Sequence, residues 1–136
     1  MFDFNDFEKY IKNKYNENPN LIRFGRLPVH ETIKIWSGLY GEKVNLKPKT
    51  EYPQKYWGIG SGRNRKGRLD ICLLNKDEIV VAIEIEEGIS YKDMEKLYNS
   101  KTENKIIIVF DMRKKILKND QLKLFIKNIK LINLDD

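Results

Sequence analysis

Apolar side chains recur at helical spacing in two segments of the N-terminal half. The first segment covers residues 2–15, and its apolar positions, three or four residues apart, are Phe4, Phe7, Ile11 and Tyr15. The second segment follows Pro28, and its shared face carries Val29, Ile33, Trp36 and Tyr40. This spacing predicts two amphipathic helices. We expect the second to run to Leu39 or Tyr40, with Gly41 as the cap residue that follows, because glycine commonly follows the C-terminus of a helix.

The remainder of the chain predicts strands and further helices. Alternating or continuously apolar runs indicate strands over residues 43–47, 68–74, 79–86, 105–110 and 129–134, the last at a sheet edge. Helices are predicted from Ser90 and over residues 120–128, and residues 49–66, rich in glycine and aromatic residues, are expected to form a long irregular loop. This order predicts an α/β fold with a mixed central sheet flanked by helices.

The length of 136 residues predicts a single domain over residues 1–136. No apolar run approaches the roughly 20 residues that span a bilayer, so no contact with membranes is expected. The lone cysteine, Cys72, has no partner for an intramolecular disulfide, and we expect it to fill core space. Together these features predict a cytoplasmic protein.

Basic residues gather in one short segment. The chain carries 26 Lys and Arg against 20 Asp and Glu, a net charge of +6. Residues 61–69 contain no acid, and their basic residues are Arg63, Arg65, Lys66 and Arg68. Such a patch predicts contacts with nucleic-acid phosphates, with Trp57 close enough in the chain to stack on a base. A solvated basic loop is the alternative, which composition alone favours.

Three acidic residues lie within otherwise apolar strands. Asp70 is near the start of one strand, and Glu84 and Glu86 end the next. Because side chains alternate, the two glutamates share a face. Asp70 joins that face if the hairpin loop has an odd number of residues, as in a three-residue loop 75–77, or if a β-bulge corrects the parity. Converging carboxylates predict a site for Mg²⁺ or Mn²⁺, whereas acids facing water at a strand end are the alternative.

The segments Arg68-Leu69-Asp70-Ile71 and Ala82-Ile83-Glu84-Ile85-Glu86 resemble the signature of the PD-(D/E)XK nuclease superfamily. The resemblance implies a restriction endonuclease-like αβββαβ core over about residues 28–112, after a helical extension over 1–27 and before a C-terminal helix and edge strand over 113–136. It also implies that Asp70 and Glu84 hold a divalent metal, with Glu31, on the second helix, as a further metal-proximal acid.

The chain departs from that signature at one position, because Glu86 stands where the family has a lysine. Glu86 would then be a second ligand or would orient the attacking water. Lys92 and Lys96, on the following helix, are candidates to replace the lysine, but their position opposite the apolar stripe predicts that they face solvent. His30, the lone histidine, is expected to be structural or exposed.

The resemblance implies a Mg²⁺- or Mn²⁺-dependent endonuclease that hydrolyses phosphodiester bonds in DNA, acting as a homodimer. An alternative is a catalytically inactive module of the same fold that binds nucleic acid or a partner protein, which the missing lysine favours. A third alternative is an unrelated α/β domain whose acids are surface charges.

Overall fold

A computed structural model describes residues 2–58, 62–88, 91–110 and 129–135 of the chain. In these residues the helices are α1 (Phe4–Glu17), the 3₁₀ helix η1 (Leu21–Phe24), α2 (Arg26–Lys43) and α3 (Tyr91–Asn99). The strands are β1 (Lys47–Gly58), β2 (Arg63–Asn75), β3 (Glu78–Glu86), β4 (Asn104–Val109) and β5 (Ile129–Asn133). Helix α1 begins at the side chain of Asp3, which accepts the N–H groups of Asn5 and Asp6.

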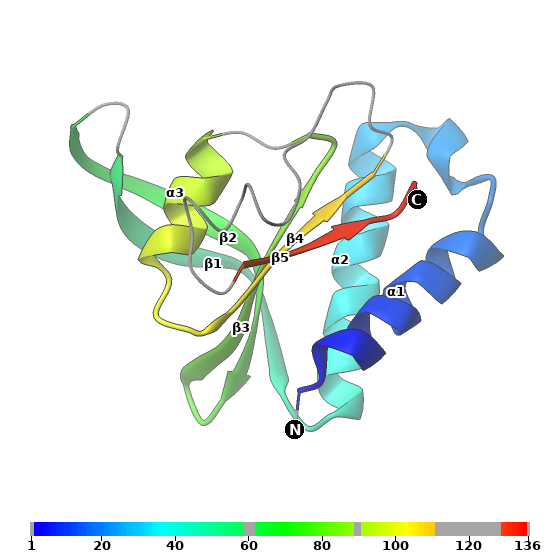
Figure 1. Ribbon diagram of the computed structural model, residues 1–136, viewed down its shortest axis with the longest axis horizontal. Helices are drawn as coiled ribbons and strands as arrows, with labels where there is room; N and C mark the ends of the chain where they lie inside the picture. Colours follow the sequence, from blue (N-terminus) through cyan, green and yellow to red (C-terminus); the bar gives the residue numbers. More distant parts are fainter. Residues whose placement is uncertain (1, 59–61, 89–90, 111–128, 136) are drawn as a thin grey trace.

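The five strands form one mixed sheet in the order β1-β2-β3-β4-β5. The β1–β2 and β2–β3 pairs are antiparallel, and the β3–β4 and β4–β5 pairs are parallel. Helices α1 and α2 lie on one face of the sheet and α3 on the other (Figure 1). This arrangement confirms the predicted α/β class with helices flanking a mixed sheet, and it places β5 at the predicted edge.

Apolar side chains fill both sides of the sheet. Strand β3 sends Val81, Ile83 and Ile85 toward α1 and α2, and Ala82 toward α3. The α3 side is completed by residues that include Met94 and the free thiol of Cys72, which fills core space as predicted. Because β3 is covered on both faces, a polar residue in its interior has no access to water.

The prediction of a long loop over residues 49–66 is wrong. Strand β1 continues to Gly58 and β2 begins at Arg63, so residues 49–58 and 63–66 belong to a long antiparallel ribbon. The predicted short strand over 43–47 is likewise replaced, because α2 extends to Lys43 and β1 starts at Lys47. Prolines and glycines suggested a loop, but an edge strand tolerates proline because one side of its backbone needs no partner.

The second helix is longer than predicted at both ends. It begins at Arg26, and Pro28 lies within its first turn, where a backbone N–H has no helical partner. Gly41 is inside the helix, and not at its C-cap, because the helix passes close to β2 there. A Cβ at position 41 would lie 2.5 Å from Cδ2 of Leu73. The predicted start at Ser90 and the helix over 120–128 lie outside the described residues.

Within the described residues, no helix has the length and apolar character needed to cross a lipid bilayer.

Substituting Gly41→Ala tests this close approach. Alanine favours a helix by about 1 kcal/mol over glycine, but the buried Leu73 must shift to admit the methyl group. We expect a net loss of about 1–2 kcal/mol in the free energy of unfolding, measured by urea denaturation. Gly38→Ala is the control, since its Cβ would meet Pro48 Cβ at 3.4 Å. Equal stability of both variants would contradict the proposed crowding at position 41.

Candidate metal centre

A β-bulge in the β2–β3 hairpin places Asp70 opposite Glu84. The turn contains two residues, Lys76 and Asp77, both with positive φ, and not the three-residue loop considered from the sequence. An even loop alone would send Asp70 and Glu84 to opposite faces. The register shifts between Leu73 and Leu74, which leaves one extra residue in β3 and restores the parity. One step beyond the Ile71–Ile83 pair, Asp70 and Glu84 therefore stand opposite each other.

Asp70 lies where β2 separates from β3. The recorded β2–β3 pairs end at Ile71–Ile83, and beyond them Asp70 Oδ2 accepts the backbone N–H of Ile85 at 2.7 Å. Ile71 packs on the α2 side of the sheet and Leu69 on the α3 side, so β2 bends at the residue between them. The carboxylate thus replaces the backbone acceptor that β3 loses when β2 turns away.

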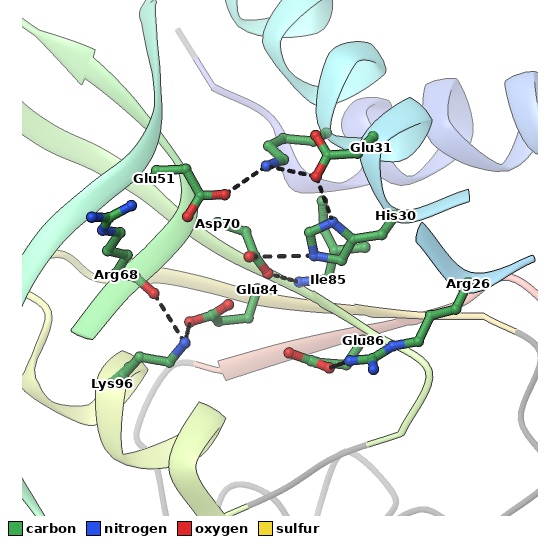
Figure 2. A network of polar contacts seen from close by, with 11 residues as sticks. Arg26, His30, Glu31, Glu51, Arg68, Asp70, Glu84, Ile85, Glu86 and Lys96 are labelled. Atoms are coloured by element: carbon green, nitrogen blue, oxygen red, sulfur yellow. Dashed lines mark hydrogen bonds and ion pairs between the residues drawn. The ribbon is translucent and has the colours of Figure 1, made fainter. Parts of the chain in front are cut away.

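The Glu84 side chain is completely buried, and its carboxyl group contacts a lysine of helix α3. Its Oε1 lies 2.6 Å from Nζ of Lys96, on α3, and that ammonium also donates to the carbonyl oxygen of Arg68 at 2.9 Å (Figure 2). Oε2 of Glu84 is buried, and no N–H group of the described residues donates to it. Burying an oxygen that receives no hydrogen bond from a donor lowers the stability of the folded protein. A cation bound next to Oε2 would offset this cost.

Glu86 completes a cluster of three carboxylates. One oxygen each from Asp70, Glu84 and Glu86 lies within 4.8 Å of the others. Glu86 Oε2 is also 3.5 Å from Nη2 of Arg26, at the start of α2. Burial raises the pKa of Glu86 to about 8, together with the charge of Asp93 and a hydrogen bond to it, while Arg26 opposes the shift. Without a cation, Glu86 therefore keeps its proton near neutral pH.

Burial and hydrogen bonds shift the pKa values of Asp70 and Glu84 in opposite directions. It raises the pKa of the Glu84 carboxyl, and the hydrogen bond and charge of Asp70 raise it further against the effect of Lys96. Burial also opposes ionisation of Asp70, but hydrogen bonds from His30, Glu84 and the Ile85 N–H lower its pKa to about 2. Asp70 is therefore the carboxyl of this pair that favours ionisation, whereas burial favours the protonated form of Glu84. The surrounding carboxylates raise the pKa of Lys96 against its burial, so it stays charged.

His30 contacts the site directly and is a partly buried residue that positions Asp70, in line with the structural one of the two expected roles. Its Nε2 lies 3.3 Å from Asp70 Oδ1, and its Nδ1 lies 3.5 Å from Oε1 of Glu31 (Figure 2). The hydrogen bond to Asp70 raises the pKa of the imidazole although burial opposes this. An imidazole N–H that donates to a carboxylate fixes the orientation of that carboxylate. His30 therefore holds Asp70 in place from α2.

Glu31 is not one of the three clustered acids. Its carboxylate lies 3.2 Å from Nζ of Lys34, which in turn lies 2.7 Å from Glu51 Oε1. Glu31 reaches the cluster only through His30 (Figure 2). Glu51 lies between the paired residues Thr50 and Tyr52 of β1 and has a φ of 51°, which marks a bend of the ribbon at this position. A role for Glu31 as a metal ligand stays a prediction.

The predicted phosphate-binding residues lie on the ribbon beyond the site. Arg63, Arg65, Lys66 and Arg68 are exposed residues of β2. Trp57 pairs with Asn64 in the register, and its side chain lies outside what the structure describes. The main-chain carbonyl of Arg68, bound by Lys96, connects this basic segment with Glu84.

Sequence reasoning placed Lys96 in solvent because it oriented α3 by Tyr91, Met94, Leu97 and Tyr98. In the structure Tyr98 is 57% exposed, whereas Asp93 and Lys96 turn inward beside Met94 and Leu97. The available signal was the spacing of Asp93 and Lys96, which places an acid and a base on one helical face. The side chain of Lys92 lies outside the described part.

The donor set fits a hard divalent cation. The three clustered residues offer carboxylate oxygens, which Mg²⁺ and Mn²⁺ prefer, and the unpartnered Oε2 of Glu84 would gain the positive neighbour that it lacks. No protein-family model, curated protein or solved structure matches this chain. The chemistry of these side chains is therefore the basis for assigning a function.

The raised pKa of Glu86 predicts how stability varies with pH in EDTA. The pKa of Glu86 is about 8 in the folded protein and near 4.5 in the unfolded chain. Between these pH values only the folded protein binds the proton, so the free energy of unfolding falls as the pH rises. We expect Glu86→Gln to lose about 2 kcal/mol less than wild type between pH 5 and 8.5, measured by urea unfolding. This is about half of the full effect of roughly 4 kcal/mol, because solvent screens the partly exposed carboxyl. Glu78→Gln, at an exposed position of β3, should retain the wild-type slope. An unchanged slope in Glu86→Gln would contradict this assignment.

Proposed function

We propose that this protein is a divalent-metal-dependent endonuclease that hydrolyses phosphodiester bonds in DNA. The observation that carries the proposal is the fully buried Glu84, which lies between Asp70 and the ammonium of Lys96 and has one oxygen that receives no N–H from the described residues. A buried acid in such surroundings is far more costly than a surface acid, which argues for a retained chemical role.

Asp70 and Glu84 would hold Mg²⁺ or Mn²⁺, with Glu86 as a third oxygen donor. When bound, the metal supplies Lewis-acid stabilisation of the phosphoryl oxygen and makes a nearby water more acidic. His30 and the Ile85 N–H fix both oxygens of Asp70, so its remaining lone pairs have a set direction.

Lys96 would take the place of the lysine that Glu86 replaces. Its ammonium is fixed at two points, by Glu84 Oε1 and the Arg68 carbonyl, and its pKa is raised, so it is present as a cation at the edge of the cluster. A fixed cation stabilises the negative charge that develops on a phosphoryl group and can donate to the attacking water. This position of Lys96 supports an enzyme over the inactive module, for which the missing lysine was the main argument.

The proposal includes a cytoplasmic location, supported by the single buried free thiol of Cys72, and it leaves homodimer formation as a prediction.

A cleavage assay tests the proposed chemistry. Wild type should nick or linearise plasmid DNA with Mg²⁺ or Mn²⁺ and not with EDTA, and Asp70→Asn should be inactive. Lys96→Met should lower the cleavage rate by about 10²–10³-fold, because a preorganised charge is lost, and Lys96→Arg should restore part of it. Lys101→Met, at an exposed lysine just after α3, is the control. Full activity in Lys96→Met would exclude Lys96 from the reaction.

Thermal unfolding separates metal binding from catalysis. Mg²⁺ or Mn²⁺ should raise the Tm of wild type, since a ligand of the folded state stabilises it by about 2.7 kcal/mol at 100 times its Kd. Glu84→Gln should gain much less, although its stability in EDTA should stay close to that of wild type because the amide resembles the protonated carboxyl that burial favours. Glu78→Gln is again the matched control. Equal metal stabilisation of wild type and Glu84→Gln would remove Glu84 from the site.

A further inference from the structure

The β1–β2 ribbon continues past the point where β3 leaves the sheet. Residues 52–58 of β1 pair with residues 63–69 of β2, and no pairs between β2 and β3 are recorded beyond Ile71. We call this two-stranded segment the ribbon arm. It extends beyond α3 at the upper left of Figure 1. At about 3.3 Å per residue, the arm reaches about 23 Å from Asp70.

All charged residues of the ribbon arm are basic. Between Glu51 and Asp70 the sequence has no acidic residue, and its basic residues are Lys55, Arg63, Arg65, Lys66 and Arg68. All five are exposed. Isolated basic side chains on a surface are common, but a projecting ribbon with cations alone concentrates positive potential away from the acids of the site.

The cations lie on both faces of the arm. Leu69 and Tyr52 pack on the α3 side, so the alternation of side chains places Arg68 and Lys66, with Lys55 opposite Lys66, on the face away from α3. Arg63 and Arg65 then share the face of Leu69. A single strand of nucleic acid offers one line of phosphates, whereas a duplex groove offers phosphates along both of its walls.

The base of the arm is rigidly connected to the cluster of carboxylates. The Gln54 side chain donates to the Lys96 carbonyl at 2.7 Å, and the Lys96 ammonium donates to the Arg68 carbonyl at 2.9 Å. The same ammonium contacts Glu84. Whatever the arm binds is therefore held at a set position relative to the cluster.

We propose that the ribbon arm inserts into the major groove of duplex DNA next to the cluster of carboxylates. The B-form major groove is about 12 Å wide and admits a two-stranded ribbon, whereas the deep and narrow major groove of duplex RNA does not admit side chains. The inference rests on the proposed function and names its substrate as duplex DNA. The arm covers about seven base pairs to one side of the reacting phosphate, at about 3.4 Å per pair.

Binding without divalent metal tests the arm independently of cleavage. Fluorescence anisotropy in EDTA compares a DNA duplex, an RNA duplex and single-stranded DNA of the same sequence. We expect wild type to prefer the DNA duplex. The variant Arg63→Gln/Arg65→Gln/Lys66→Gln should bind it about 10–100-fold more weakly at moderate salt, with a salt slope reduced by about 2–3. The variant Lys9→Gln/Lys47→Gln/Lys101→Gln removes equal charge from exposed positions outside the arm and should bind with a nearly unchanged slope.

A methylation-protection experiment tests which groove of the DNA the arm occupies. Bound protein should protect guanine N7, which lies in the major groove, from methylation, and the triple variant of the arm should lose this protection. Equal or tighter binding of single-stranded DNA or duplex RNA, protection confined to the minor groove, or equal salt slopes in the two triple variants would overturn the arm proposal. Arm-dependent duplex binding by a protein that cleaves no DNA would overturn the proposed endonuclease activity alone, and cleavage with arm-independent binding would overturn the arm alone.

Discussion

The burial of Glu84 is the constraint around which this site is organised. Strand β3 is covered by α2 on one face and α3 on the other, so a carboxylate in its interior loses its hydration. Desolvation of an ion costs several kcal/mol even after the protein relaxes. One oxygen of Glu84 contacts Lys96, and the other receives no N–H from the described residues. Helix α3 places the charge of Lys96 next to Glu84. The raised pKa of Glu86 favours its neutral form and so reduces the negative charge in this region.

Asp70 connects that constraint with the shape of the sheet. Its carboxylate accepts the Ile85 N–H at the point where β2 bends away, so the same side chain ends the β2–β3 ladder and faces Glu84. Because β2 departs there, β1 and β2 continue as a ribbon on their own. The separation of two strands thus creates both a polar opening at the sheet and a projecting basic arm. Lys96 joins them, since its ammonium contacts Glu84 and the Arg68 carbonyl.

Helices α2 and α3, on opposite faces of the sheet, both place charged side chains next to the clustered acids and shift their pKa values. From α2, His30 supports the ionised form of Asp70, and Arg26 opposes the raised pKa of Glu86. From α3, Asp93 adds negative charge next to Glu86, while Lys96 compensates Glu84. In the absence of a cation, Glu84 and Glu86 therefore favour their protonated forms, and a divalent metal would displace those protons. Metal binding to such a site is coupled to proton release and to stability.

Local patterns were sufficient for the fold class and for the central acids. Apolar periodicity predicted α1, α2 and the strands around Asp70 and Glu84, because each of these elements buries one or both faces in the core. An acid flanked by apolar residues on both sides marked Glu84 as buried without any coordinates. The ribbon was missed, since proline and glycine indicate turns locally, and an edge position that tolerates them is not visible in the sequence.

The sequence by itself determined which acids could meet, because strand alternation places Glu84 and Glu86 on one face whatever the rest of the chain does. Only the tertiary structure decided that Asp70 joins them, since a bulge between the paired strands, and not the turn length alone, restores the parity. It also decided the partners of these acids. Lys96 and His30 lie on helices whose rotation about their axes depends on packing against the sheet. A helical pattern with polar residues beside its apolar stripe leaves that rotation open, and the buried contacts of the folded protein select it.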